Sequence, residues 1–124
     1  MVLMEKITVV IGASPNPERV SYTAIRKLNK MNIPFIAIGR KDCDLGDIKI
    51  VKGMPEDVRK VHTVTLYMNA RNQIEYYDYI LSLQPERIIF NPGSNNPELT
   101  RLALEQGINV VECCMLVMIA TGRF

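Results

Sequence analysis

Short β-branched runs alternate with amphipathic segments along the whole of this sequence, and this alternation limits the fold more than any other feature. Residues 7–11 (Ile-Thr-Val-Val-Ile) are typical of a buried strand, and the period then changes, with Val20, Ala24 and Leu28 on one helical face. The alternation continues along the rest of the chain. Further strands are predicted at 34–38, 62–67, 87–90 and 109–111, and helices at 18–30, 72–83, 97–106 and 113–121.

This order of elements predicts an α/β fold with one doubly wound, Rossmann-like parallel sheet, because strands that alternate with helices pair in parallel through right-handed crossovers. The 124 residues contain no internal repeat, low-complexity tract or linker, so we expect a single domain over 1–124. Two segments are less regular. The polar loop 41–52 is expected to hold a short strand at 48–51, and 55–57 (Pro-Glu-Asp) is typical of a short helix start.

Charge, hydropathy and cysteine content argue against several classes of protein. The formal net charge of +2 is too small to indicate binding to nucleic acid or to a membrane surface. The longest apolar run, 113–120, is far shorter than the roughly 20 residues needed to span a bilayer, and we expect no signal peptide. Three cysteines form no disulfide framework, and no cysteine and histidine set has zinc spacing. We therefore predict a cytoplasmic protein without a bound metal.

Four loops are expected to form the ligand-binding edge. In a doubly wound sheet, ligands bind outside the carboxyl ends of the strands, at the switch point beside the first strand. The loops that leave these ends are 12–19, 39–41, 68–71 and 91–96. A ligand site is therefore predicted among these four loops.

The loop after the first strand is suited to an anion. Gly12 allows the backbone to turn and to approach a ligand, and the start of the next helix offers free N–H groups. Ser14, Asn16 and Ser21 add side-chain donors, and Arg19 adds a cation suited to phosphate. The Gly-x-Gly-x-x-Gly fingerprint and the Gly-Lys-Ser/Thr phosphate loop are both absent. The alternative is a plain connection in which Ser14 or Asn16 caps the helix.

The loop after the second strand carries cations where nicotinamide-binding folds place an acid for the adenosine ribose hydroxyls. In this chain the position holds Gly39, and Arg40 and Lys41 follow. Two cations in place of an acid disfavour NAD and favour an adenosine with an extra ribose phosphate, as in NADP or coenzyme A. The alternative is that Arg40 and Lys41 are a solvated pair, and the neighbouring Asp42 weakens their field.

Four segments form a recognisable set: 12–17 (Gly-Ala-Ser-Pro-Asn-Pro), 38–41 (Ile-Gly-Arg-Lys), 90–98 (Phe-Asn-Pro-Gly-Ser-Asn-Asn-Pro-Glu) and 112–118 (Glu-Cys-Cys-Met-Leu-Val-Met). Together they resemble the small stand-alone coenzyme A-binding proteins, which are similar to the nucleotide-binding amino-terminal domain of the succinyl-CoA synthetase α subunit. The resemblance spans nearly the whole chain. Its most specific parts are the first segment and the Asn-Pro-Gly segment.

The resemblance implies that the chain binds coenzyme A or an acyl-CoA. The ADP part would lie across the first two loops, and the pantetheine arm would pass 67–69 and 92–93. Many members have a proline-containing turn where this chain has Met68-Asn69-Ala70, so the pantetheine contacts depart from the family pattern. The predicted cofactor-binding residues are Gly12, Ala13, Ser14, Pro15, Asn16, Arg19, Ser21, Tyr22, Gly39, Arg40, Lys41, Met68, Asn69, Pro92 and Gly93.

Two classes of function remain open. The first is a binding module, a carrier, sensor or regulator that takes acyl-CoA without evident catalysis. The second is an enzyme, either an NADP-dependent oxidoreductase or an acyl-CoA transferase or ligase component. Glu18, Glu98 and the lone His62 form no convincing catalytic set, so no catalytic residue is predicted and His62 is interpreted as structural. The cations of the first two loops disfavour a third reading, a scaffold that has lost its ligand.

Two apolar segments bear on redox chemistry and assembly. Cys113 and Cys114 could form a mixed disulfide with a thiol cofactor, but their apolar neighbours favour inert thiols that act as small hydrophobes. In the 72–83 helix, Tyr76, Ile80 and Leu83 form a second apolar face. That face could bury against another subunit, which leaves a homodimer open beside ordinary core packing.

Overall fold

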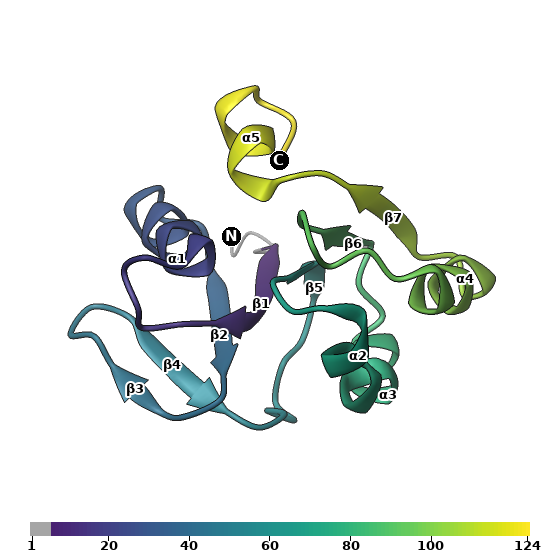
Figure 1. The fold of residues 1–124 in the computed structure, drawn as a ribbon, viewed down its shortest axis with the longest axis horizontal. Helices are drawn as coiled ribbons and strands as arrows, with labels where there is room; N and C mark the ends of the chain where they lie inside the picture. The colour runs from purple at the N-terminus through teal and green to yellow at the C-terminus, as the bar shows by residue number, and fades with distance from the viewer. Residues whose placement is uncertain (1–5) are drawn as a thin grey trace, which may run out of the picture.

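The computed structural model describes residues 6–124, whose strands form one seven-stranded sheet with helices on both faces (Figure 1). The strands are β1 (Ile7–Ala13), β2 (Phe35–Gly39), β3 (Cys43–Asp44), β4 (Lys49–Lys52), β5 (Val61–Leu66), β6 (Arg87–Phe90) and β7 (Asn109–Glu112). Their order in the sheet is β3-β4-β2-β1-β5-β6-β7. All neighbouring strands pair in parallel except β3 and β4. The predicted doubly wound α/β fold is therefore confirmed, with one antiparallel edge strand that the sequence did not indicate.

The first strand lies at the centre because both of its faces are apolar. Val9 and Ile11 belong to the core on one side of the sheet and Val10 to the core on the other, and all three are fully buried. β1 pairs with β2 on one side and with β5 on the other. The chain therefore changes direction across the sheet between β4 and β5, and the switch point lies at the carboxyl ends of β1 and β5.

The helices divide between the two faces of the sheet (Figure 1). One face carries α1 (Val20–Lys30) and α5 (Met115–Ala120), and the other carries α2 (Ala70–Gln73), a 3-10 turn (Ile74–Tyr76), α3 (Tyr77–Ser82) and α4 (Pro97–Glu105). Ala24, Leu28 and Met115 form part of the first core, and Ile80 and Leu99 part of the second. In the described part of the chain, none of the helices combines the length and hydropathy needed to cross a bilayer.

The short helix expected to start at 55–57 does not form, and that prediction is wrong. This segment is irregular, and the carbonyl of Pro55 accepts a hydrogen bond from the Tyr79 hydroxyl at 2.8 Å. Val58 is the one apolar residue just after it that packs on a core. A helix here would have no apolar face to bury, and without burial a short helix is marginal in water.

The helix predicted at 72–83 begins earlier, at Ala70, and the 3-10 turn divides it. Its second apolar face lies against this chain's own core. Ile80 is fully buried, and Tyr76 and Leu83 pack on the same core cluster. A homodimer therefore does not follow from this face.

Candidate functional site

The strand register brings the ends of the parallel strands, and the loops that follow them, to one edge of the sheet. The aligned residues at this edge are Lys52, Gly39 and Ala13 on one side of the switch point, and Ile11, Leu66, Phe90 and Glu112 on the other. The loops after β1, β2, β5 and β6 therefore leave the sheet side by side, as predicted. The chain that follows β7 joins them, which places Cys113 and Cys114 at the same edge.

Two glycines allow the strand ends to approach one another closely. Gly12 has a φ of +97°, and a Cβ atom there would lie 2.9 Å from the carbonyl carbon and oxygen of Tyr67. A Cβ atom on Gly39 would lie 2.6 Å from the carbonyl oxygen of Ala13 and 2.7 Å from Cγ2 of Ile50. Gly12 was expected to allow the approach of a ligand, but in this structure its close contact is with the backbone that follows β5.

The loop after β1 is held by its own polar groups. Oγ of Ser14 accepts from the backbone N–H of Asn16 at 3.1 Å, and Oδ1 of Asn16 accepts from that of Glu18 at 3.0 Å. The N-cap of α1 is Arg19, and no side chain caps this helix. The alternative in which Ser14 or Asn16 caps the helix is therefore wrong. Both side chains use their acceptor atoms inside the loop, so the hydroxyl hydrogen of Ser14 and Nδ2 of Asn16 stay available as donors.

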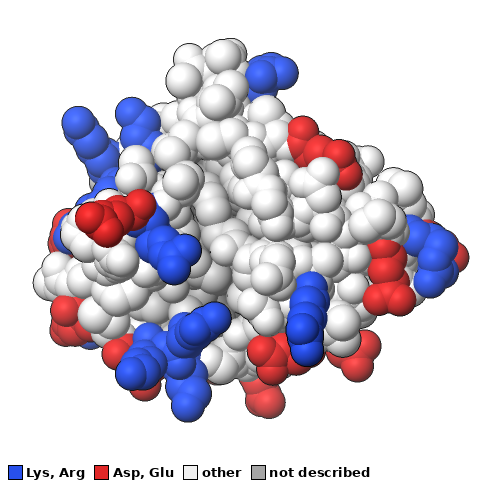
Figure 2. Space-filling model, in the orientation of Figure 1, with Lys and Arg blue, Asp and Glu red and all other residues white. Residues whose placement is uncertain are grey.

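Basic side chains without acidic partners stand along this edge. Arg19, Arg40 and Lys41 are exposed, and none forms an ion pair with any residue that the structure describes. Lys52, which ends β4, and Arg71, in α2, are two further exposed cations that the sequence analysis did not single out. Figure 2 shows basic side chains grouped over the ends of β2 and β4, beside a hollowed and largely uncharged surface. The edge therefore presents positive charge suited to phosphate.

A buried amide, Asn91, fixes the ends of β5 and β6 to the start of α5. Its Nδ2 donates to Oγ1 of Thr65 at 2.7 Å and to the carbonyl of Leu66 at 2.9 Å, and its Oδ1 accepts from the N–H of Met115 at 2.8 Å. Asn91 is only 2% exposed. Both of its N–H donors and its amide oxygen form hydrogen bonds inside the protein, so its role is to position the surrounding backbone.

A second buried amide, Gln73, connects the loops after β5 and β6. Its Nε2 donates to the carbonyls of Met68 and Ser94, both at 2.8 Å, and its Oε1 accepts from Nδ2 of Asn96 at 2.8 Å. Asn96 also caps α4 by accepting from the N–H of Leu99 at 3.0 Å. The sequence signal for Asn96 was the proline that follows it, whereas Gln73 lies in a polar helical turn that gave no signal.

Of the predicted pantetheine residues, Asn69, Pro92 and Gly93 lie at the exposed tips of these two loops, whereas Met68 is half-buried and packs on a core cluster. Pro92 and Gly93 occupy the centre of a turn closed by the N–H of Ser94 donating to the carbonyl of Asn91 at 2.9 Å, and the φ of +90° at Gly93 suits glycine. Asn69 is the N-cap of α2. Hydrogen bonds from Gln73 and Asn91 therefore hold the base of these two loops, while the loop tips are exposed to solvent.

Ser21 and Tyr22 are predicted site residues that the structure places on α1, behind the loop. Ser21 is only 4% exposed. The hydroxyl of Tyr22 accepts from Nε of Arg26 at 3.1 Å, and Arg26 in turn bonds Asp47 at 2.7 Å. Ala13 is also buried, so only its backbone is available at the edge. Contacts of Ser21 and Tyr22 with a ligand stay a prediction.

Tyr67 lies where β1, β5 and α5 meet. Its hydroxyl is buried and has no hydrogen-bond partner among the described residues. Burial raises the pKa of Tyr67 well above its ordinary value, and the neighbouring thiol of Cys114 raises it further. The Thr65 hydroxyl lies close enough to offset this pKa shift slightly, although its geometry falls outside that of a hydrogen bond.

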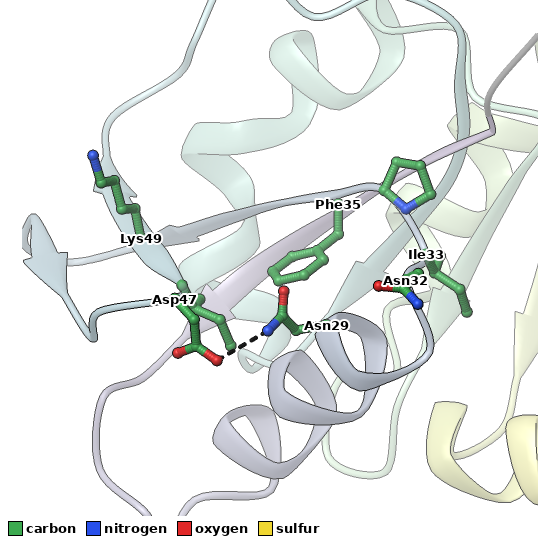
Figure 3. Close-up of a pocket in the computed structure, with 8 residues that line it drawn as sticks. Asn29, Asn32, Ile33, Phe35, Asp47 and Lys49 are labelled. Atoms are coloured by element: carbon green, nitrogen blue, oxygen red, sulfur yellow. Dashed lines mark hydrogen bonds between the residues drawn. The ribbon is translucent and has the colours of Figure 1, made fainter.

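His62 and a surface hollow beside β2 and β4 lie away from this edge. His62 is the second residue of β5, where its Nδ1 is 2.8 Å from Oγ1 of Thr63 and burial lowers its pKa. A hollow of about 430 Å³ lies beside the first residues of β2 and β4, where Nδ2 of Asn29 donates to Oδ2 of Asp47 at 3.1 Å (Figure 3). None of the predicted site residues lines this hollow.

Comparison with known proteins gives a family and a set of folds. The family model described as "CoA binding domain" matches residues 6–120. A solved structure titled as an uncharacterized protein is 42% identical, covers 97% of this chain and 98% of its own, and has a TM-score of 0.90. A hypothetical protein from Pyrococcus horikoshii OT3 (24% identity, 91% and 80% coverage, TM-score 0.78) and a Thermus thermophilus protein (20%, 94% and 90%, 0.82) share the fold. No curated protein matches the chain.

Proposed function

Because this chain belongs to the family of CoA binding domains, we propose that it binds coenzyme A or an acyl-CoA across the carboxyl edge of its sheet. The observation that carries the proposal for the site is the set of exposed cations Arg19, Arg40 and Lys41 after β1 and β2, which form no ion pair with any described residue. The chain acts as a carrier, sensor or regulatory module in the cytoplasm, where three free cysteines are ordinary.

The loop after β1 receives the pyrophosphate in this proposal. The hydroxyl of Ser14 and Nδ2 of Asn16 donate to phosphate oxygens, because their acceptor atoms are engaged inside the loop. Arg19 adds a charge-assisted contact from the N-cap position of α1, and the uncapped N–H groups of this helix favour an anion. Gly12 serves this site indirectly, since it allows β1 and the backbone of Tyr67 to meet beneath it.

Arg40 and Lys41 read the 3′-phosphate of coenzyme A. They follow Gly39, which is buried and aligned with Ala13, so the two cations stand next to the loop assigned to the pyrophosphate. The pantetheine arm then runs from the switch point past Met68 and Asn69 and the Pro92-Gly93 turn. The amide groups of the pantetheine arm suit this stretch, because Gln73 holds the backbone of both loops in place.

Changing both Arg40 and Lys41 to alanine is expected to weaken coenzyme A roughly 5- to 30-fold, because screened charge-assisted contacts contribute about 1–2 kcal/mol for the pair. Dephospho-coenzyme A lacks the 3′-phosphate and should bind the variant and the parent almost equally. Calorimetry of both ligands against both proteins forms a complete cycle that isolates the phosphate contribution.

The matched control is Lys27→Ala with Lys30→Ala, which removes the same charge from the exposed last turn of α1. It should leave both affinities within about twofold, since screened charges beyond a Debye length interact weakly. If the Arg40 and Lys41 variant weakens both ligands by the same factor, these residues do not read the 3′-phosphate, and Arg19 becomes the next candidate.

A further inference from the structure

The vicinal cysteines lie beside the loops assigned to the pantetheine arm, a placement that their sequence did not reveal. The N–H of Cys113 donates to the carbonyl of Phe90 at 3.2 Å, which continues the pairing of β7 with β6. Asn91 directly follows Phe90. Its Oδ1 accepts from the N–H of Met115, and its Nδ2 donates to the carbonyl of Leu66. Cys114 is therefore held between the end of β6 and the end of β5, directly beside the switch point.

The surroundings distinguish the two thiols. Cys113 is half-buried and packs on the apolar core beneath α1 and α5. Cys114 is also half-buried but belongs to neither core cluster, and its neighbour is Tyr67. Tyr67 in turn supports Gly12 across the switch point. Cys114 therefore lies outside the apolar cores and beside Tyr67, whereas Cys113 packs among apolar side chains.

We propose that Cys114 forms a reversible mixed disulfide with coenzyme A bound at this edge. The inference rests on the proposed function, and it joins two independent observations: the family match to a CoA binding domain, and a free cysteine at the same edge. Coenzyme A ends in a thiol at the tip of its pantetheine arm. Binding that places this tip between β5 and β6 brings one sulfur to the other.

The step is a thiol–disulfide exchange with coenzyme A disulfide as the second reactant. The thiolate of Cys114 attacks one sulfur of the disulfide, so the new bond joins Sγ of Cys114 to that sulfur. The old S–S bond breaks, and the other coenzyme A leaves as a thiolate that takes up the proton released by Cys114. The sulfur of Cys114 is oxidised and the departing sulfur is reduced. A free thiol reverses the reaction, so the site would report the redox state of the coenzyme A pool.

The test exposes the reduced protein to coenzyme A disulfide and follows the intact mass without reductant. We expect one adduct per chain, located at Cys114 by peptide mapping, and formed at least about tenfold faster than the adduct from glutathione disulfide, because binding raises the local concentration of the reactant. Cys114→Ser should lose the adduct. Cys113→Ser and Cys43→Ser should keep it, and saturating desulfo-coenzyme A should suppress it.

Calorimetry with desulfo-coenzyme A separates this inference from the proposed function, since that ligand has no thiol. If desulfo-coenzyme A binds but no adduct forms, or the adduct maps to Cys113, the inference is wrong and the binding function stands. Equal rates with glutathione disulfide would also overturn it, by showing an ordinary exposed thiol. If desulfo-coenzyme A does not bind, the proposed function fails and this inference fails with it.

Discussion

Replacing Gly12 with alanine is expected to lower the free energy of unfolding by about 4 kcal/mol and to abolish coenzyme A binding. Two effects add at this position. The φ of +97° strains any residue with a side chain, and the new Cβ would lie 2.9 Å from two backbone atoms of Tyr67. Backbone cannot move aside as a flexible side chain can, so β1 and the end of β5 must separate. Denaturant unfolding followed by circular dichroism measures the loss.

Gly46→Ala is the matched control for this prediction. Gly46 has a similar φ of +93°, but a Cβ atom there would meet nothing within 4 Å. This variant should therefore cost only the backbone strain, about 1–2 kcal/mol, and leave coenzyme A binding intact. If the two variants cost the same, the close approach of β1 to Tyr67 contributes nothing to stability.

Asn91→Ala is expected to destabilise the protein by about 3 kcal/mol. The variant leaves the buried N–H of Met115 without its acceptor and Oγ1 of Thr65 without its donor. The carbonyl of Leu66 is less affected, because Oγ of Ser94 also donates to it at 2.9 Å. The start of α5 should loosen first, so amide hydrogen exchange at Met115 should accelerate more than exchange in β1.

Asn95→Ala tests whether this effect belongs to the buried amide or to the loop in general. Asn95 lies in the same loop but is exposed, so its loss should change stability by no more than about 0.5 kcal/mol. An Asn91 variant as stable as the Asn95 variant would contradict the positioning role of Asn91. If Asn95→Ala loses as much stability as Asn91→Ala, the loss comes from the loop backbone and not from the buried amide.

The parallel strands and most helices could be predicted because the spacing of their apolar residues shows which faces are buried. The 87–90 strand and the 97–106 helix were predicted almost to the residue, since an apolar run and a proline-started helix each carry clear end signals. Segment 55–57 has the Pro-Glu-Asp sequence of a helix start but no apolar face to bury. The helix predicted there from local sequence therefore does not form. β3 was missed because two residues give no periodicity, and its pairing with β4 depends on tertiary contact.

The convergence of the four loops at one edge could be predicted from the sequence, but the hydrogen bonds that build this edge could not. Strand ends meet at one edge whatever their side chains are, so topology alone brought the four loops together. The buried amides that fix this edge could not be read, because Gln73 looks like an ordinary polar helical residue until its three partners are placed. The sequence analysis also did not indicate that the Tyr22 hydroxyl bonds Arg26 within α1.

The shift in melting temperature with each of three nucleotides tests the central claim most directly. A ligand that binds only the folded state stabilises it according to the ratio of its concentration to its dissociation constant, so equal concentrations rank the affinities. We predict the largest upward shift with coenzyme A, a smaller one with NADP, which carries its extra phosphate on the 2′ position, and the smallest with NAD, which has none. Equal shifts with NAD and coenzyme A, or no shift with coenzyme A, would contradict the account.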